Sequence, residues 1–435
     1  MPRAPRHAPS VSRRLFLKQS LVAGGALAFP WVLRARAVAP SNRITLGVIG
    51  IGPRCRLVLG SMLEETDVQC VAICDVQADR RAIGKKMVDD KYGNTDCVTI
   101  RDFRELLARR DIYAVLIATG DHWHALASIM TAKAGKDIYS EKPCAMTMAD
   151  CEAIEETMKR YGRVFQAGTQ RRSIGNFQLA VQLARTGKLG RLHTLRASIY
   201  RPNTRHDWLP AEPLPPRDEV DWDIWLGPCP ERPYNREYVT GGWRGHYDFD
   251  SGGSILDWGA HTADLCQWAN DADDTTPIEY EPSADFITAR YANGVKLVFE
   301  YHDRPFDKTP SSSIARLGTC PVRFEGDEGW VETGDNGNIE ASPASLKRDL
   351  RQLGQQRAGT DAGSHARNFF DCIKSRAITN ANPHVMRQTH VACHAAAIAL
   401  ELNLKVAFNP AKEEFLNDPE ANRLRSRAKR EPYTI

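Results

Sequence analysis

A lysine that directly follows a short apolar strand is the first candidate for chemistry. Residues 138–143 read Ile-Tyr-Ser-Glu-Lys-Pro, so Lys142 stands where a predicted buried strand ends, and Pro143 fixes the backbone behind it. In open α/β sheets, ligands bind at the carboxyl ends of the strands. A lysine ammonium there can offset negative charge that develops on a reacting oxygen. The tripeptide alone fits a salt bridge as well as a catalyst.

A second group of candidates lies on a helix predicted over residues 255–268. Asp257 and His261 are four residues apart and share one helix face, and Asp264 follows three residues later. An acid that orients a histidine, beside a lysine from another part of the chain, can carry out acid–base chemistry. The same spacing fits a capping aspartate and a structural histidine, so both interpretations stay open.

The elements before Lys142 predict a dinucleotide-binding unit. An apolar strand over residues 44–49 leads into a turn with Gly50 and Gly52, and Cys55 stands where a third glycine is usual. In this fingerprint the first two glycines allow a tight turn and a close approach to pyrophosphate, and the third allows close helix packing. Cysteine is small, so this substitution weakens the match without removing it.

A second apolar strand, over residues 68–74, ends at Asp75, 25 residues after Gly50. An acid at this place accepts hydrogen bonds from the adenosine ribose and repels a 2′-phosphate. The sequence therefore favours NAD over NADP, while Arg80 and Arg81 keep NADP possible.

The remaining pattern predicts two domains. Further strands are expected over 97–100, 113–117, 137–139 and 164–167, and helices over 79–91, 102–109, 121–134 and 147–161. This alternation indicates an α/β, doubly wound parallel sheet over residues 42–167. Residues 168–435 read as an α+β domain with an open sheet. Its strands are expected over 192–200, 286–291, 295–301 and 322–325, after and around a proline-rich irregular segment over 202–233.

Asp121, His122 and His124 open one predicted helix and invite a metal interpretation. Their spacing alone does not give a closed tetrahedral set, and we expect no metal. We expect Asp121 to cap the helix, with the aromatic groups of this segment near a nicotinamide.

Residues 1–37 are typical of an export signal. Residues 12–18, Ser-Arg-Arg-Leu-Phe-Leu-Lys, form a twin-arginine pattern that precedes a short apolar run and an Ala-Arg-Ala cleavage site. The run is too short and interrupted for a stable membrane anchor. Removing residues 1–37 changes the formal net charge from +4 to −3, which argues against a nucleic-acid partner.

The 11 cysteines contain no Cys-x-x-Cys pair. Export after folding in the reducing cytoplasm would explain so many thiols without a disulfide framework. We expect most of them to be buried apolar fillers. Export in the folded state also suits a protein that carries a tightly bound nucleotide into the periplasm.

Together these motifs resemble the Gfo/Idh/MocA oxidoreductase family, over nearly the whole chain after residue 37. The matching segments are Gly50–Cys55, Asp75, Asp121–His124, Glu141–Pro143 and Asp257–Asp264. The departures are Cys55 and Gly120, where a proline is common. The segment 222–228 and the tail near 418–433 are similar to the secreted, twin-arginine branch of that family.

The resemblance implies a Rossmann domain followed by a domain with a large, mostly antiparallel sheet that often mediates homodimers or homotetramers. It implies that Lys142 binds the reacting hydroxyl, that His261 is the general base, and that Asp257 assists or orients the substrate and His261. The Lys142–Pro143 peptide bond is often cis in the family. The implied cofactor site comprises Gly50, Gly52, Arg54, Asp75, Thr119, Asp121, His122, Trp123, His124, Glu141 and Lys142.

The expected function is NAD(P)-dependent hydride transfer to or from a hydroxyl of a sugar, glycoside or polyol. One alternative is an NAD-dependent glycosidase that works by transient oxidation and elimination, and a less favoured one is a non-catalytic nucleotide-dependent sensor. The candidate substrate-binding residues are Arg171, Arg172, Trp243, His246 and Asp264, and Arg244 is a further candidate for binding substrate hydroxyls or carboxylates. Each of these arginines also fits a salt bridge, and each tryptophan fits core packing.

Overall fold

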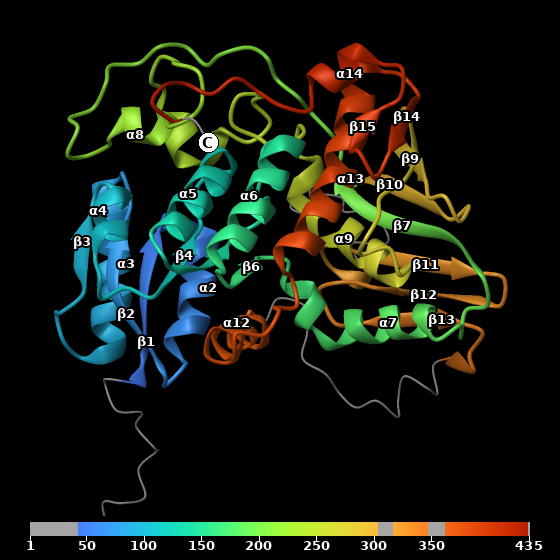
Figure 1. Cartoon of the computed structure of the whole chain (residues 1–435), viewed down its shortest axis with the longest axis horizontal. Helices are drawn as coiled ribbons and strands as arrows, with labels where there is room; N and C mark the ends of the chain where they lie inside the picture. Colours follow the sequence, from blue (N-terminus) through green and yellow to red (C-terminus); the bar gives the residue numbers. More distant parts are fainter. Residues whose placement is uncertain (1–41, 303–315, 347–361, 434–435) are drawn as a thin grey trace, which may run out of the picture. The chain divides into compact units, whose positions relative to one another are not determined.

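Two sheets carry the fold of this computed structural model (Figure 1). The structure describes residues 42–302, 316–346 and 362–433. The predicted export signal over residues 1–37 lies outside them.

The first sheet has six parallel strands in the order β3-β2-β1-β4-β5-β6. Its strands are β1 (Ile44–Ile49), β2 (Val68–Cys74), β3 (Val98–Ile100), β4 (Ala114–Ile117), β5 (Asp137–Ser140) and β6 (Phe165–Ala167). The helices between them are α2 (Pro53–Leu63), α3 (Ala78–Tyr92), α4 (Phe103–Ala108), α5 (Asp121–Lys133) and α6 (Met148–Tyr161). This order is that of a dinucleotide-binding fold, whose ligand crevice lies where the order reverses, between β1 and β4. The predicted Rossmann architecture is confirmed.

Helix α6 shows how local sequence sets these elements. The side chain of Thr147 accepts a hydrogen bond from the backbone N–H of Asp150, which caps the first turn. Lys159 and Arg160 lie in the last turn, where positive charge is favoured. Gly162, at φ 58°, ends the helix in the left-handed conformation.

The second sheet has nine strands in the order β13-β12-β11-β7-β10-β9-β8-β14-β15. They are β7 (Leu192–Tyr200), β8 (Glu279–Pro282), β9 (Phe286–Arg290), β10 (Lys296–His302), β11 (Val322–Gly326), β12 (Gly329–Thr333), β13 (Ile339–Ser342), β14 (Val406–Asn409) and β15 (Glu414–Phe415). Their pairs are antiparallel except β7 with β10, which is parallel. The sheet is therefore mixed and mostly antiparallel, as expected from the resemblance.

The remaining helices are α7 (Gly175–Arg185), α8 (Trp222–Leu226), α9 (Ile255–Ala269), α12 (Gly363–Ser375), α13 (Pro383–Leu402) and α14 (Pro419–Arg423). Of these, α7, α9 and α13 pack on the second sheet, and α12 packs on α2. Gly259 of α9 allows close packing, since a Cβ there would lie 3.3 Å from Cys393 of α13 and 3.4 Å from Ile199 of β7. Because residues 43–435 form one compact unit, the boundary expected near residue 168 stays a prediction.

The predicted irregular segment between β7 and α9 has a small core of its own. Trp222 and Trp225 stack at 4.8 Å and pack with Tyr238 and Phe249. The segment also bonds to the first sheet, because the N–H of Asp221 donates to the β2–α3 turn at Val76. In Figure 1 this segment and α8 lie at the same end of the first sheet as the start of α5. Trp222 and Trp225 therefore have a packing role in this segment.

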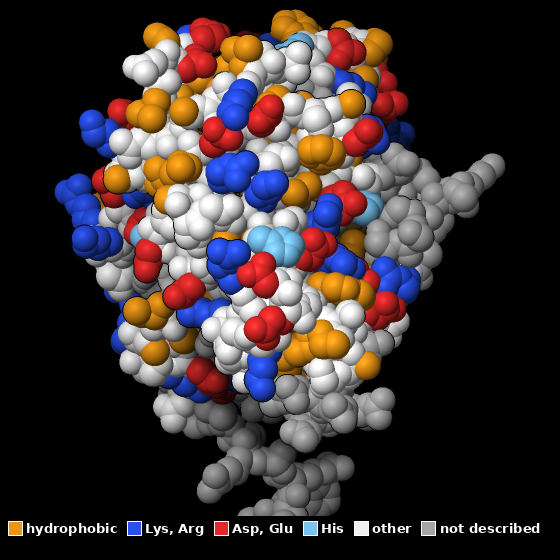
Figure 2. Space-filling view, turned by 90° about the vertical axis from the view of Figure 1, so that its right-hand side faces the viewer, with side chains coloured by type: hydrophobic (Ala, Val, Ile, Leu, Met, Phe, Trp, Pro, Cys, Tyr) orange, Lys and Arg blue, Asp and Glu red, His pale blue; other side chains and the backbone are white. Residues whose placement is uncertain are grey.

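All eleven cysteines are buried free thiols, which confirms the expectation that they are apolar fillers. In the described ranges, no helix combines the length and the hydropathy that a membrane span needs. On the face shown in Figure 2, side chains of both charge signs are interspersed with scattered hydrophobic ones.

Candidate active site

The glycine turn after β1 has the geometry that a dinucleotide needs. Gly50 adopts φ +86°, and a Cβ on it would lie 2.7 Å from the main-chain oxygen of Ala118. A side chain there would clash with the end of β4. Gly52 precedes α2, and a Cβ added to it would meet open space, with Arg80 Nη1 as its nearest neighbour at 4.0 Å. The turn thus leaves the backbone at the start of α2 accessible to a phosphate.

Asp75, at the end of β2, is held by two backbone donors. Its Oδ2 accepts from the N–H of Ile51 at 2.7 Å, and its Oδ1 accepts from the N–H of Gln77 at 2.9 Å. Burial raises the pKa of this carboxyl, and the nearby positive charge of Arg80 opposes the rise. Each oxygen keeps a lone pair for a ribose hydroxyl.

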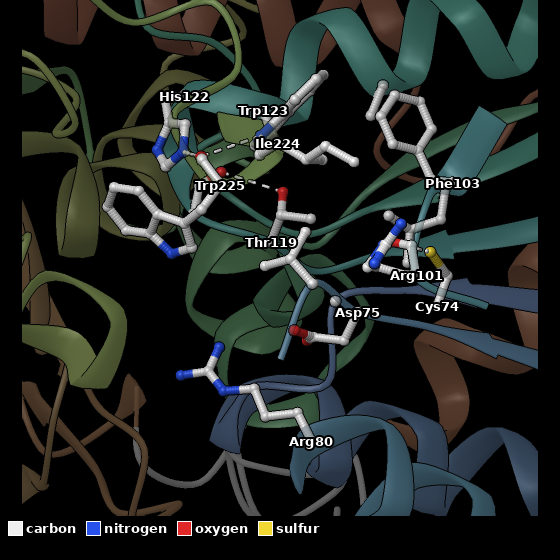
Figure 3. A pocket seen from close by; sticks show the side chains of 15 residues that line it. Cys74, Asp75, Arg80, Arg101, Phe103, Thr119, His122, Trp123, Ile224 and Trp225 are labelled. Carbon is white, nitrogen blue, oxygen red and sulfur yellow. Dashed lines mark hydrogen bonds between the residues drawn. The ribbon is translucent and has the colours of Figure 1, made fainter. Parts of the chain in front are cut away.

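A cavity of about 540 Å³, part of it open to solvent, lies at the carboxyl ends of β1 and β4 (Figure 3). Five of the expected cofactor residues line it: Gly50, Asp75, Thr119, His122 and Trp123. Sequence reasoning missed Arg101, Phe103, Ile224 and Trp225, which also line it. The last two lie in the segment 222–228, which the resemblance had marked without a role.

The start of α5 is locked to α8 across this cavity. His122 Nε2 lies 2.7 Å from the main-chain oxygen of Trp225, and Trp123 Nε1 donates to that of Ile224 at 2.7 Å. Gly227 lies flat against Trp123, where a Cβ would come within 2.3 Å of the indole ring. Burial lowers the pKa of His122 to about 4, so this histidine is neutral at ordinary pH.

Asp121 and His124 contact other loops instead of lining the cavity. Gly120 is the N-cap of α5, so the expectation that Asp121 caps this helix is wrong. Asp121 accepts a hydrogen bond from the N–H of Ser251 at 3.3 Å, and Arg244 lies 3.5 Å away. His124 Nδ1 lies 2.6 Å from the main-chain oxygen of Pro143, and this contact fixes the lysine loop, residues 141–143. Burial lowers the pKa of His124 to about 4. No group of three or more metal-ligating side chains occurs among the described residues.

Lys142 and Asp257 meet at the centre of the site. The Lys142 Nζ donates to Oδ1 of Asp257 at 2.7 Å and to its main-chain oxygen at 2.6 Å. The peptide bond between Lys142 and Pro143 is cis, as the resemblance implied. Burial disfavours the Asp257 carboxylate, but the positive charges of Arg244 and Lys142 outweigh this and lower its pKa. Asp257 is therefore ionised at ordinary pH.

His261 is fully buried one helical turn further along α9. Burial is the main cause that lowers its pKa well below the ordinary value, followed by the positive charges of Arg171 and Lys142. Its Nδ1 has no hydrogen-bond partner within the described chain. Asp257 and His261 form no hydrogen bond with each other in the described structure, because the Asp257 carboxylate pairs with Lys142 and Arg244.

Glu141 and Arg54 tie the glycine turn to the lysine loop. Arg54 Nε of α2 donates to Oε1 of Glu141 at 3.0 Å. Gly168 lies against this carboxylate, because a Cβ on it would approach within 2.8 Å. The ion pair between Arg54 and Glu141 thus connects the expected nucleotide-binding turn to the loop that carries Lys142.

Several expected substrate residues have partners inside the protein. Arg171 forms a two-point ion pair with Asp335, and Arg172 pairs with Asp264 and Asp273. Asp264 also accepts from Thr389, so the geometry favours a structural role for Arg172 and Asp264. His246 Nδ1 lies 3.1 Å from the main-chain oxygen of Asp207, and Trp243 supports the guanidinium of Arg244 at 4.4 Å.

Two family models together match most of the chain. One, described as "Oxidoreductase family, NAD-binding Rossmann fold", matches residues 44–169. The other, described as "Oxidoreductase family, C-terminal alpha/beta domain", matches residues 203–435.

Individual relatives match over shorter stretches. The chain is similar to inositol 2-dehydrogenase of Salmonella typhimurium, with 28% identity over 205 residues, 45% of this chain and 55% of that protein. It is also similar to glycosyl hydrolase family 109 protein 1 of Shewanella sp., with 34% identity over 172 residues, 35% of this chain and 38% of that protein. The chain thus spans about half the length of the curated relatives it matches, or less.

The solved structure of an aldose-aldose oxidoreductase from Caulobacter crescentus has a similar fold. Its TM-score is 0.57 at 19% identity, and the match covers 84% of this chain and all of that one (100%). At this identity the likeness concerns the fold alone.

Proposed function

Because the chain belongs to the Gfo/Idh/MocA oxidoreductase family, we propose that it is an NAD(P)-dependent oxidoreductase acting on CH–OH groups. It transfers hydride between a nicotinamide cofactor and a hydroxyl-bearing carbon of a sugar, glycoside or polyol. The observation that carries this proposal is the contact between Lys142 and Asp257, with His261 one helical turn away. It unites the carboxyl end of a Rossmann strand with a helix of the second domain.

The residues around this contact have separable tasks. Lys142 holds the substrate oxygen and offsets its negative charge as the hydroxyl proton leaves. His261 is neutral because its pKa is lowered, and its Nδ1 is unpartnered, so it can accept that proton. Asp257, ionised at ordinary pH, keeps Lys142 in place through the 2.7 Å contact.

The residues of the cavity fit a nicotinamide dinucleotide. The space at Gly50 would be filled by a Cβ, and Asp75 presents a carboxylate beside the glycine turn. When bound, the dinucleotide supplies the hydride acceptor or donor. Asp75 supports NAD over NADP, and Arg80, which lies beside it in Figure 3, keeps NADP possible.

The cofactor is proposed to be tightly bound. The main-chain oxygen of Val239 accepts from Arg80 at 2.8 Å and from Gln77 at 3.1 Å. Ile224 accepts from Trp123 on the opposite wall. These bonds join the segment before α9 to both walls of the cavity and support slow release of a bound nucleotide.

An NAD-dependent glycosidase is the second candidate, and the similarity to a glycosyl hydrolase family 109 protein favours it. In this reaction, transient oxidation of a ring hydroxyl acidifies the neighbouring C–H and elimination releases the aglycone. Water then adds to the resulting enone, and the hydride returns to the ketone. Lys142 and His261 serve both reactions. Release of the aglycone from a nitrophenyl glycoside without net NADH would distinguish this reaction from a dehydrogenase.

The proposal also includes where the protein works and how it assembles. The twin-arginine pattern over residues 12–18 supports folded export to the periplasm, without a stable membrane anchor. The family resemblance supports a homodimer or homotetramer. The net charge after removal of the signal supports a small-molecule partner over nucleic acid.

Purification from the periplasm without denaturation tests this function. Absorbance and mass spectrometry of the purified protein should reveal a nicotinamide nucleotide, and neutral sugars or polyols should reduce it. A protein that carries no nucleotide would contradict tight binding. A protein that neither carries one nor binds added NAD or NADP would overturn the function itself.

A further inference from the structure

Arg244 is a positively charged residue at the site that has no direct role in the proposed hydride transfer. It comes from the segment between α8 and α9 and reaches three carboxylates. Its Nη1 lies 3.5 Å from Asp121 and 3.6 Å from Asp250, and its Nη2 lies 3.7 Å from Asp257. Such distances are those of ion pairs, too long for good hydrogen bonds. Within the described residues, Nη1 is a buried donor without a hydrogen-bond partner.

The exposure of these groups separates those a ligand can reach from those it cannot. Lys142, Asp257 and Arg244 have side chains 13%, 17% and 26% exposed. Asp121 and Asp250, at 2% and 0%, lie beneath them. The partly exposed face of the cluster therefore consists of two cations that converge on one carboxylate oxygen, Asp257 Oδ1.

This face matches a second hydroxyl group. A hydroxyl both accepts and donates hydrogen bonds, so it can accept from Arg244 and donate to Asp257. Lys142 has three N–H donors, two of which go to Asp257, so one is left for the reacting oxygen. The indole ring of Trp243 holds the guanidinium from one side at 4.4 Å.

The charges of the cluster select among possible ligands. Two cations, Lys142 and Arg244, face three carboxylates, those of Asp121, Asp250 and Asp257. The cations are already neutralised, so a carboxylate on the substrate would meet repulsion that a neutral hydroxyl does not meet.

We propose that Arg244 determines specificity by binding a second hydroxyl of the substrate, next to the one held by Lys142. The site then takes a neutral vicinal diol in preference to an isolated alcohol or a sugar acid. This inference rests on the proposed function, because it places the reacting hydroxyl at Lys142.

Binding, measured by calorimetry, tests the proposal without requiring turnover. D-glucose, D-galactose and D-mannose are titrated into the nucleotide-loaded protein, and the tightest-binding aldose is compared with its monodeoxy analogues and its uronate. Arg244→Met should weaken binding of the aldose about ten- to a hundredfold, since a hydrogen bond to a charged group is lost. One monodeoxy analogue should bind the wild type as weakly as the intact aldose binds Arg244→Met. Arg244→Met should bind this analogue and the intact aldose with the same affinity. The uronate should bind the wild type more weakly than the aldose does.

Two further variants make the result specific. Arg244→Lys keeps a positive charge without the planar fork and should show a smaller loss, so the test survives if Arg244→Met does not fold. Arg236→Met removes an exposed arginine of the same segment and should bind like the wild type. Unchanged binding in both Arg244 variants, an equal loss for every analogue, or no aldose binding at all would overturn the proposal. Binding without reduction of the nucleotide would instead overturn hydride transfer and leave the role of Arg244 intact.

Discussion

Lys142 Nζ donates to two oxygens of one residue, the carboxylate Oδ1 of Asp257 at 2.7 Å and its main-chain oxygen at 2.6 Å. The backbone contact does not depend on the ionisation of the carboxylate, so it fixes the lysine to the start of α9 by itself. The carboxylate contact adds charge pairing at a place where both side chains are only slightly exposed. The position of the Lys142 ammonium is therefore set by Asp257 of α9, whereas strand β5 sets only the position of the Lys142 backbone.

Lys142→Met should strongly slow hydride transfer while leaving the fold intact. The methionine side chain keeps the bulk of the lysine stem but has no ammonium, so kcat should fall about a hundred- to ten-thousandfold. Nucleotide content, measured by absorbance after purification, should stay unchanged because Lys142 does not line the cavity. Lys159→Met, at an exposed position of α6, is the matched control. Full activity in Lys142→Met would refute the proposed role.

His261→Gln should separate a base from a structural histidine. Glutamine keeps similar volume but cannot take up the proton, so kcat should fall about a hundred- to ten-thousandfold with little change in KM. The lowered pKa keeps His261 neutral below pH 6.5, so wild-type activity should persist below the pH where an ordinary histidine becomes protonated. Steady-state rates from pH 4.5 to 9 measure this. His193→Gln, on the exposed start of β7, should behave like the wild type.

Much of this fold was predictable from the sequence because its strands are short apolar runs. Ile44–Ile49 and Val68–Cys74 were predicted with correct bounds, since apolar β-branched residues end at Gly50 and Asp75. The parallel pairing of β7 with β10 was not predictable, because strand direction depends on connections rather than on residue pattern. Helix α13 was missed because buried residues surround it on most sides, which removes its amphipathic signal.

The site was predictable in its members but not in its pairing. The spacing of Asp257 and His261 correctly places both on α9, but it cannot show that Lys142 and Arg244 compete for the carboxylate. Arg172 and Asp264 are 92 positions apart in the chain, so only the folded structure reveals their ion pair. Long-range charge pairing is the information that a single sequence does not contain.

Gly50→Ala should remove the nucleotide. The added Cβ would lie 2.7 Å from the main-chain oxygen of Ala118, at φ +86°, so the turn must shift away from the geometry that admits a pyrophosphate. Nucleotide content should fall sharply, and stability should fall by about 1–3 kcal/mol. Gly60→Ala, inside α2 with no atom within 4 Å of the new Cβ, is the control. It should retain the nucleotide and gain about 0.5–1 kcal/mol.

Asp264→Asn distinguishes a structural carboxylate from a substrate-binding one. Removing this charge leaves Arg172 buried with one carboxylate partner instead of two, so the free energy of unfolding should fall by about 3 kcal/mol. KM should stay unchanged. Denaturant titration and steady-state kinetics on the same preparation measure both quantities. A raised KM with unchanged stability would restore the substrate role that the sequence suggested.

Asp250→Asn should change how stability depends on pH. Burial raises the pKa of the Asp250 carboxyl to about 6, and the positive charge of Arg244 limits the rise. In the unfolded chain an aspartate titrates at about 3.9, so between about pH 4 and pH 6 only the folded state holds this proton. The contribution of Asp250 to stability is therefore complete at low pH and is lost as the pH rises to about 6.

The free energy of unfolding of the wild type, minus that of Asp250→Asn, should fall over this window and be level above it. Denaturant titrations at half-unit pH steps measure this difference, with Asp218→Asn at an exposed carboxylate as the baseline. A difference that rises with pH instead would mean that Arg244 outweighs burial and holds Asp250 ionised throughout.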